Sequence, residues 1–232
     1  MITFMGKKAI NIFGYVVLIV SCIGIAIGMV LDWERWVWWT KPWLAPSIML
    51  IFWAGWKRSE DLVFWHIIIG LLFSWMGDLF LMIPKEFLNG EILGISSFSL
   101  AMINYISAFY YDGGYWGKDC VLYRQPQWLI GVVTAVIVGI FLISKHFTGL
   151  LGILVPMYAV LLPGMMLIAV NRRGRVPDIG YFRVARGAML FVAADVFLAY
   201  MAIYCPIRYG HIPMMAGYVA AQYMIATGLL KR

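Results

Sequence analysis

The chain has 232 residues, of which 63% are hydrophobic and only 12% carry a charge. Soluble domains have about 25% charged residues, so the composition excludes an ordinary soluble protein and indicates an integral membrane protein. The net charge of +7 would fit nucleic-acid binding in a soluble protein. In a membrane protein it follows from the excess of Lys and Arg in cytoplasmic loops, and we expect no nucleic-acid partner.

The first apolar run, Ala9–Leu31, follows Lys7 and Lys8. It is longer than a signal-peptide core and lacks a small-x-small cleavage site, so we interpret it as a retained first span. Apolar runs of about 17–25 residues are long enough to cross a bilayer. We therefore predict a single all-α domain over residues 1–232 with eight transmembrane helices. Two of the apolar runs, Trp43–Trp56 and Trp128–Ile143, are short and are expected to extend into their flanks. The eight predicted helices are Ala9–Leu31, Trp43–Trp56, Leu62–Ile83, Glu91–Tyr111, Trp128–Ile143, Leu150–Val170, Val184–Tyr204 and Ile212–Leu230.

A segment with four tryptophans, Asp32–Thr40, precedes the second helix. Tryptophan favours the membrane interface, so we expect this segment at the outer headgroup level. Lys41 and Pro42 then open the helix, with Pro at its favoured first position. Two interpretations of Lys41 stay open: it extends its charged end to the interface, or it binds the phosphate of a phospholipid.

The orientation follows from the basic residues. The termini and even-numbered loops contain Lys7, Lys8, Lys57, Arg58, Lys118, Arg124, Arg172, Arg173, Arg175, Arg183, Lys231 and Arg232, whereas the odd-numbered loops contain only Arg35, Lys41, Lys85, Lys145 and Arg208. Because positive residues accumulate in cytoplasmic loops, both termini are predicted to be cytoplasmic. In a bacterium the protein would lie in the inner membrane.

Two acidic residues occur inside predicted spans, Asp78 in the third and Asp195 in the seventh. An ionisable group at that depth costs several kcal/mol unless it has a partner, a proton or water, and it usually marks a functional site. The two helices run in the same direction, and the acids lie at similar depths. We therefore expect both carboxyls in one cavity, although a purely structural acid is the alternative.

The surroundings of the two acids differ. Asp78 follows Gly77 and shares a helix face with Ser74, which would admit water and favour an ionised carboxylate. Asp195 has only apolar neighbours on its own helix, so its partner must come from another helix. Desolvation favours a protonated carboxyl, and we hypothesise that Asp195 is a proton donor and Asp78 its ionised partner.

The eighth predicted helix carries Tyr218 and Gln222 on one face, one turn apart. Such a pair often joins helices by hydrogen bonds. Beside two intramembrane acids, a role in a binding site is equally consistent. The three Cys and three His are scattered without metal-ligand spacing, and we expect no metal.

Several short segments follow one another along the chain, namely Lys41-Pro42, Gly77–Met82, Phe98 through Tyr105 to Phe109, Arg186–Phe191 with Ala194-Asp195, and Tyr218–Gln222. In this order they resemble the lysoplasmalogenase (YhhN) family of eight-helix membrane hydrolases. Family members usually have His three residues before the equivalent of Tyr105, where this chain has Met102. They often have Ser before the second acid, where this chain has Ala194.

The resemblance implies hydrolysis of the vinyl ether bond of a lysoplasmalogen, a lysophospholipid, to a fatty aldehyde and a glycerophospho-alcohol. Asp78 and Asp195 would be the catalytic residues, and Lys41, Tyr105, Tyr218 and Gln222 would bind the substrate. Acid–base chemistry of this kind needs no cofactor. The implied partners are the substrate and membrane lipids, and the resemblance implies nothing about oligomeric state.

Two alternatives use the same acids. Intramembrane aspartyl proteases have Gly-x-Gly-Asp, but here the sequence is Trp75-Met-Gly-Asp78, and no Pro-Ala-Leu motif occurs. A non-enzymatic lipid-binding protein or proton-coupled carrier could use the acids as relay sites. Carriers commonly contain repeats and broken helices, and Pro156 and Pro163 in the sixth predicted helix are the only such indication in the sequence.

Overall fold

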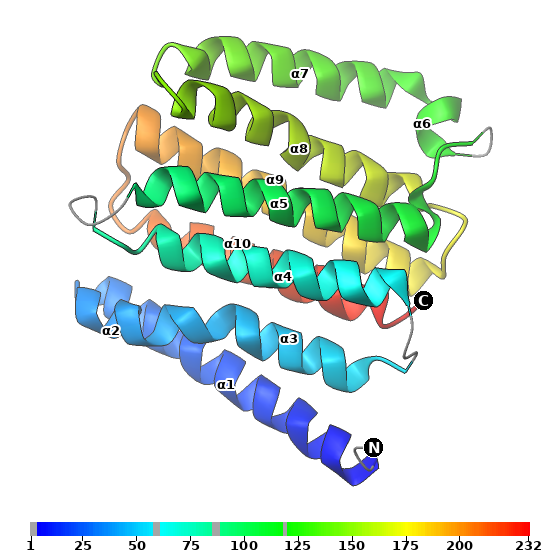
Figure 1. The fold of residues 1–232 in the computed structure, drawn as a ribbon, viewed down its shortest axis with the longest axis horizontal. Coiled ribbons are helices and arrows are strands. Elements are labelled where there is room, and N and C mark those ends of the chain that lie inside the picture. The colour runs from blue at the N-terminus through cyan, green and yellow to red at the C-terminus, as the bar shows by residue number, and fades with distance from the viewer. Residues whose placement is uncertain (1–3, 58–60, 85–88, 118–119) are drawn as a thin grey trace.

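The computed structural model describes residues 4–57, 61–84, 89–117 and 120–232, and in these residues it contains helices and no β-strand (Figure 1). The all-α prediction is therefore confirmed. Each predicted helix has a counterpart, and the largest change in a helix start is at α9, which begins at Asp178 instead of Val184. The long helices are α1 (Phe4–Val30), α3 (Leu44–Gly55), α4 (Leu62–Phe80), α5 (Gly90–Phe109), α7 (Pro126–Ser144), α8 (Leu151–Asn171), α9 (Asp178–Ile203) and α10 (His211–Leu229).

Six helices within the described residues are long and apolar enough to cross a membrane, namely α1, α4, α5, α7, α8 and α9. This is consistent with a multi-pass integral membrane protein. α3 has only 12 residues, but α2 (Glu34–Thr40) and the 3-10 turn η1 (Lys41–Trp43) lead directly into it. α10 has 19 residues and includes Gln222, which suits a helix in the protein interior. That α3 and α10 also cross, giving eight spans, stays a prediction.

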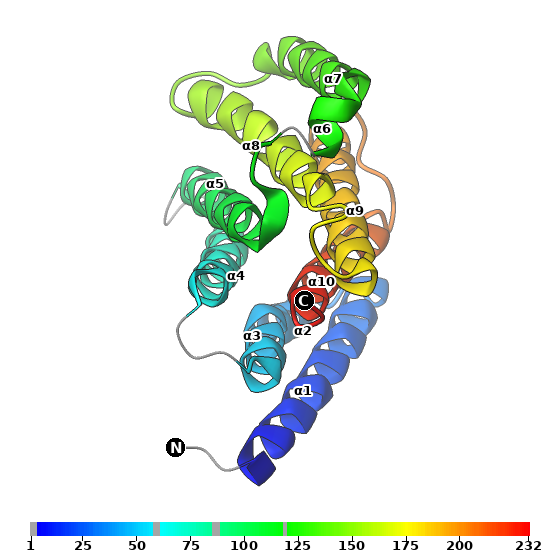
Figure 2. The same cartoon turned by 90° about the vertical axis from the view of Figure 1, so that its right-hand side faces the viewer.

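Six helices form a closed ring. Around the ring, α3 packs on α4, α4 on α5, α5 on α8, α8 on α9, α9 on α10 and α10 on α3. The end view in Figure 2 shows this arrangement, with α1 beside α3 and α10, and α7 outside α8. The ring matters for function because it can bring polar side chains from six different helices to one interior position.

α2 packs closely on α1 through small residues. A Cβ atom added to Gly24 would lie 2.5 Å from Cγ2 of Thr40, and one added to Gly28 would lie 2.9 Å from Cγ2 of Val37. Small residues four apart allow such close approach between membrane helices. The tryptophan-rich segment thus forms a helix against α1 whose Trp side chains are exposed; its position at the outer interface stays a prediction.

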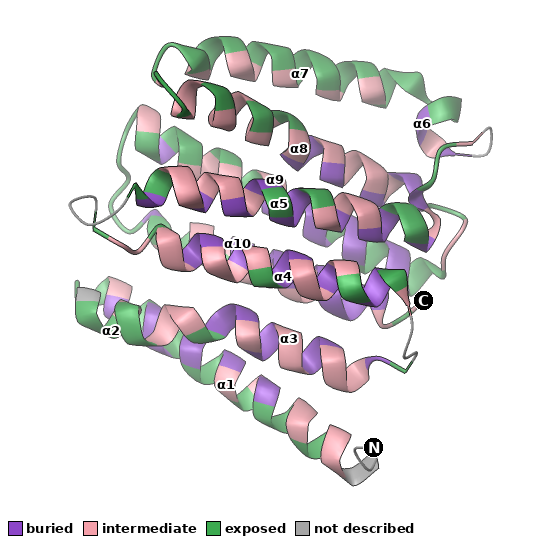
Figure 3. Cartoon of the chain, viewed as in Figure 1, coloured by how far each residue is buried: buried purple, intermediate pink, exposed green. Residues whose placement is uncertain are grey.

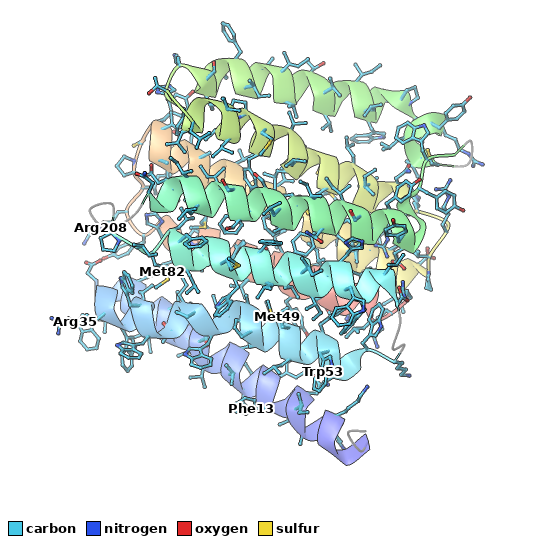
Figure 4. The ribbon with its side chains drawn as sticks, in the orientation of Figure 1. Phe13, Arg35, Met49, Trp53, Met82 and Arg208 are labelled. Atoms are coloured by element: carbon cyan, nitrogen blue, oxygen red, sulfur yellow. The ribbon has the colours of Figure 1, made fainter. Side chains whose placement is uncertain are left out.

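Both termini lie at the same end of the bundle (Figure 1). Arg35 and Arg208, two of the cations assigned to outer loops, lie at the opposite end (Figure 4). This arrangement agrees with an even number of crossings, whereas the cytoplasmic location of the termini stays a prediction. Arg58, Lys85 and Lys118, which also entered the charge comparison, lie outside the described residues.

Arg172 does not act as a solvated loop cation, as its place in the charge comparison implied. Its side chain is fully buried and pairs with Asp112 in η2 (Tyr110–Gly114), a π-helical turn that follows α5. Arg232 binds the other carboxylate oxygen of Asp112 at 3.0 Å and also pairs with Asp61, the N-cap of α4. A buried Arg requires such a counter-charge, and the network joins α4, α5, α8 and the C-terminal residue at one end of the ring.

Burial is uneven across the bundle (Figure 3). α7 has no buried residue, whereas α9 and α10 meet through glycines. A Cβ atom added to Gly187 would lie 2.9 Å from the carbonyl oxygen of Ala221, and one added to Gly228 would lie 3.0 Å from the backbone N of Val184. Because backbone atoms are the obstacle, a side chain at these positions would separate the two helices.

Replacing Gly187 by Leu is expected to destabilise the protein by about 1–3 kcal/mol, the usual cost of overpacking. Gly131 on α7 provides a matched control, since nothing lies within 4 Å of a Cβ added there. Thermal unfolding in detergent should show a lower Tm for Gly187→Leu than for Gly131→Leu. Equal Tm values for the two variants would contradict the close α9–α10 packing.

Candidate functional site

The Asp78 carboxylate lies in the last turn of α4 and is only 6% exposed. Its Oδ1 atom is 3.3 Å from Nζ of Lys41, and its Oδ2 atom accepts a 2.8 Å hydrogen bond from the hydroxyl of Tyr218 on α10. A buried carboxylate needs a counter-charge and hydrogen-bond donors, and Asp78 has both. Three residues that sequence analysis singled out are thus in direct contact.

The backbone around Lys41 is held in place by α4. The indole Nε1 of Trp75 donates a 2.8 Å hydrogen bond to the carbonyl oxygen of Pro42. Trp75 is three residues before Asp78 and therefore lies on nearly the same face of α4. One face of α4 thus positions η1 and also carries the Asp78 carboxylate that Lys41 contacts. Lys41 is therefore paired inside the bundle, and its side chain is 16% exposed.

Asp195 on α9 is bound by the hydroxyl of Tyr158 on α8, which donates to its Oδ2 atom. The expectation that its partner must come from another helix agrees with this contact, but sequence analysis did not select Tyr158. A signal was available, since Tyr158 is the only hydroxyl-bearing residue of α8 and lies between Pro156 and Pro163. No cation pairs with Asp195 among the described residues.

Aromatic rings connect the two acid–tyrosine pairs. The ring centroid of Phe98 on α5 lies 6.2 Å from that of Tyr218 and 6.5 Å from that of Tyr158. Gly77 allows this ring to approach, because a Cβ there would lie 2.8 Å from it. Gly77 was expected to admit water beside Asp78, but Phe98 fills that space, and the neighbouring charge is Lys41.

Tyr105 on α5 lies against the part of α4 that precedes Asp78. Its hydroxyl is 3.3 Å from Oγ of Ser74, one turn before Asp78, and its ring lies against Gly70. Met102, one turn before Tyr105, is fully buried in the core. Its thioether is neither an acid nor a base at ordinary pH, so this side chain contributes packing.

Gln222 lies one turn beyond Tyr218 on α10 and is 2% exposed. Neither its Oε1 nor its Nε2 atom has a hydrogen-bond partner in the described structure. Leaving a buried polar group unpaired costs about 1–3 kcal/mol. An amide in this state provides a donor and an acceptor that a ligand inside the ring can satisfy.

The ring carries polar groups on or beside all of its helices, with Lys41 just before α3, Asp78 on α4, Tyr105 on α5, Tyr158 on α8, Asp195 on α9, and Tyr218 and Gln222 on α10. The ring of Phe98 lies beside the tyrosines that bind both acids. That the carboxyls share one substrate cavity stays a prediction. Among the described residues, no group of three or more His, Cys, Asp or Glu could hold a metal ion.

A comparison with protein families matches residues 36–229 to the model of the YhhN family. The chain belongs to the YhhN family. Membership indicates a membrane hydrolase-like role. The match includes every site residue described above and most of α2, but not α1. No curated protein and no solved structure gave a significant match to this YhhN protein.

The pairing of Lys41 with Asp78 can be tested by a double-mutant cycle. Lys41→Met should lower the Tm, because removing one partner of a buried ion pair typically costs about 3–5 kcal/mol, less where the carboxyl gains a proton. Adding Asp78→Asn should recover part of the loss, since an amide needs no counter-charge.

Lys57→Met is the control for that cycle, because Lys57 is exposed at the other end of α3. It should change the Tm little, alone or with Asp78→Asn. Strictly additive effects of Lys41→Met and Asp78→Asn would show that the two side chains do not interact.

Proposed function

We propose that this protein hydrolyses the vinyl ether bond of lysoplasmalogen-type lysophospholipids, yielding a fatty aldehyde and a glycerophospho-alcohol. The observation that carries the proposal is the unequal environment of two carboxyls inside one ring of helices. Asp78 contacts a cation, whereas Asp195 is bound by a neutral hydroxyl. Two carboxyls held in different environments are what paired acid and base catalysis requires.

The reaction needs a proton first. Protonation of the alkenyl carbon next to the CH–O group produces an oxocarbenium ion, and water then adds to that ion to form a hemiacetal. The hemiacetal breaks down into the aldehyde and the free alcohol, so one water is consumed overall. We assign the proton donation to Asp195 as general acid, after which its carboxylate accepts a proton from the attacking water.

Tyr158 supports this role of Asp195. A hydrogen bond becomes stronger when its acceptor becomes charged, so the hydroxyl of Tyr158 stabilises the carboxylate that forms when Asp195 gives up its proton. Tyr158 thus acts through Asp195 and positions it.

Asp78 has the complementary role. The ammonium of Lys41 at 3.3 Å and the hydroxyl of Tyr218 at 2.8 Å stabilise its ionised form. A fixed negative charge in a low-dielectric site stabilises a developing cation strongly, and the oxocarbenium ion is such a cation. An ammonium has three N–H donors, so Lys41 can also bind the phosphate of the headgroup, and Gln222 can bind the glycerol oxygens.

The first test is hydrolysis of lysoplasmalogen by the purified protein, measured as released aldehyde. Asp195→Asn and Asp78→Asn should each lower the rate by about 10²–10⁴-fold, as expected for loss of a general acid or base. Asp178→Asn, an exposed acid at the start of α9, is the control and should retain the wild-type rate. Gel filtration should show that all variants remain folded.

An absence of aldehyde release from the wild-type protein would instead favour a lipid-binding protein or carrier that uses the same acids. Asp195→Asn with near wild-type activity would remove Asp195 from the mechanism.

Tyr158→Phe removes the hydroxyl that donates a hydrogen bond to Asp195 and so tests its role in the reaction. We expect kcat to fall by about 10- to 100-fold, because a hydrogen bond to a charged group contributes about 1.5–3 kcal/mol, with little change in KM. Tyr223→Phe is the matched control, since its hydroxyl contacts Tyr15 at 3.4 Å and neither acid. A similar loss in both variants would mean that removing a tyrosine hydroxyl disturbs the bundle as a whole.

A further inference from the structure

An apolar groove lies between α10 and α1, the helix that stands outside the ring (Figure 2). Its volume is about 450 Å³, and its lining runs along residues 15–29 of α1 and residues 212–223 of α10, with Leu44 of α3 behind them. Small side chains, among them Ala26 and Ala216, make the groove hollow. None of the described residues that line it carries a charge, so the groove favours an apolar ligand.

Both walls of the groove are held in place from other sides. α1 packs closely on α2 at Gly24 and Gly28, and on α3 at Gly14, where an added Cβ would lie 3.2 Å from the carbonyl oxygen of Ser47. α10 is held against α9 by the glycine contacts described above. α1 therefore cannot move toward α10 and close the groove without losing its own contacts. An unfilled groove would leave apolar walls without packing partners, which costs dispersion energy.

The groove has the depth of one leaflet of a bilayer. Its α1 wall lies inside a candidate span, and residues 212–223 of α10 extend for about 16 Å along the helix axis. This length is close to half of the roughly 30 Å hydrocarbon core. At the end nearer the termini the hydroxyls of Tyr15 and Tyr223 lie 3.4 Å apart and join the two helices. A third helix, about 10–12 Å in diameter, cannot enter between helices joined in this way.

The other end of the groove lies near two cations. Met29 and Ile212 line the groove at this end. Arg208 lies one turn before Ile212 in the sequence and Arg35 belongs to α2, and both lie at the end of the bundle opposite the termini (Figure 4). Both side chains are exposed, and Arg208 keeps its charge although it lies over the ring of Tyr209. Positive charge at this end favours the phosphate of a lipid.

We propose that this groove binds one acyl chain of a bilayer phospholipid, with the headgroup at the end that holds Arg35 and Arg208. The chain fills the space that the two fixed walls leave open, and it thereby connects α1 to the ring. Ala216 of α10 lines the groove, whereas Tyr218 of the same helix binds Asp78 inside the ring. Lipid binding in the groove is thus separate from the acidic residues and does not depend on the proposed hydrolysis.

The first test is photo-crosslinking of the full-length, delipidated protein in neutral detergent. The probe is phosphatidylglycerol with a diazirine midway along one acyl chain, and the labelled peptides are mapped by mass spectrometry. Labelling of residues 15–29 and 212–223 should saturate and should be competed by unlabelled phosphatidylglycerol. α7 is the internal control, because a helix without buried residues should be labelled in proportion to the probe. Proportional labelling of all three helices would overturn the proposal without any variant.

The second test fills the groove with side chains. Ala26→Phe combined with Ala216→Phe should abolish the saturable labelling, because the phenyl rings take the place of the chain. Ala135→Phe is the matched control, since Ala135 is exposed on α7, and it should be labelled like the wild type. Added phosphatidylglycerol should raise the Tm of the wild type and of the control, because a ligand stabilises the state that binds it, but not that of the filled variant.

Gel filtration should show that the filled variant is folded, and native mass spectrometry gives its oligomeric state. Saturable labelling that persists in the filled variant, or an equal loss in Ala135→Phe, would contradict an acyl chain in the groove. A wild-type dimer that the filled variant breaks would also contradict it, because a second copy would then cover this face.

Discussion

Burying the carboxylate of Asp78 requires a positive charge and a hydrogen-bond donor at the same level of an apolar bundle. Lys41 supplies the charge and Tyr218 supplies the donor, and these residues come from opposite parts of the sequence. The segment that leads into α3 must therefore place Lys41 next to α4. In addition, α10 must lie inside the bundle and not at its edge. The 3-10 turn η1, whose Pro42 carbonyl accepts a hydrogen bond from Trp75, places Lys41 beside α4. The close glycine contacts between α9 and α10 hold α10 inside the bundle.

The same requirement is met differently at Asp195. Its partner is the neutral hydroxyl of Tyr158, and no Lys or Arg among the described residues pairs with it. One acid is thereby held next to a cation, and the other next to a neutral hydroxyl. Chemistry that passes through a cation can use both kinds of carboxyl, and the ring carries them on α4 and α9.

Much of this arrangement could be predicted from the sequence. Hydropathy located the apolar helices of the described residues because apolar runs of about 17–25 residues are typical of helices that cross a bilayer. Asp78 and Asp195 stood out because a charge in such a run is costly, and Tyr218 stood out beside Gln222. Lys41 was selected as well, but its pairing with Asp78 depends on how α3 and α4 pack, which helix periodicity does not specify.

Other features depend on tertiary contacts alone. Tyr158 was missed because a single Tyr in an apolar helix is equally typical of core packing. Arg172 was counted with the loop cations, since a run of basic residues is indistinguishable in sequence from a solvated anchor. Its partner Asp112 is 60 residues away, in a turn whose π-helical geometry the sequence does not indicate.

Among the described residues α7 has no buried residue and packs chiefly on α8, so as a membrane span it would face lipid over most of its surface. A helix dissolved in hydrocarbon is constrained by its overall hydropathy and not by the shape of its side chains. Apolar residues in α7 are therefore free to exchange for one another over evolutionary time. In α10, by contrast, nine of the 19 residues are buried, and Gly228 leaves no room for a larger side chain.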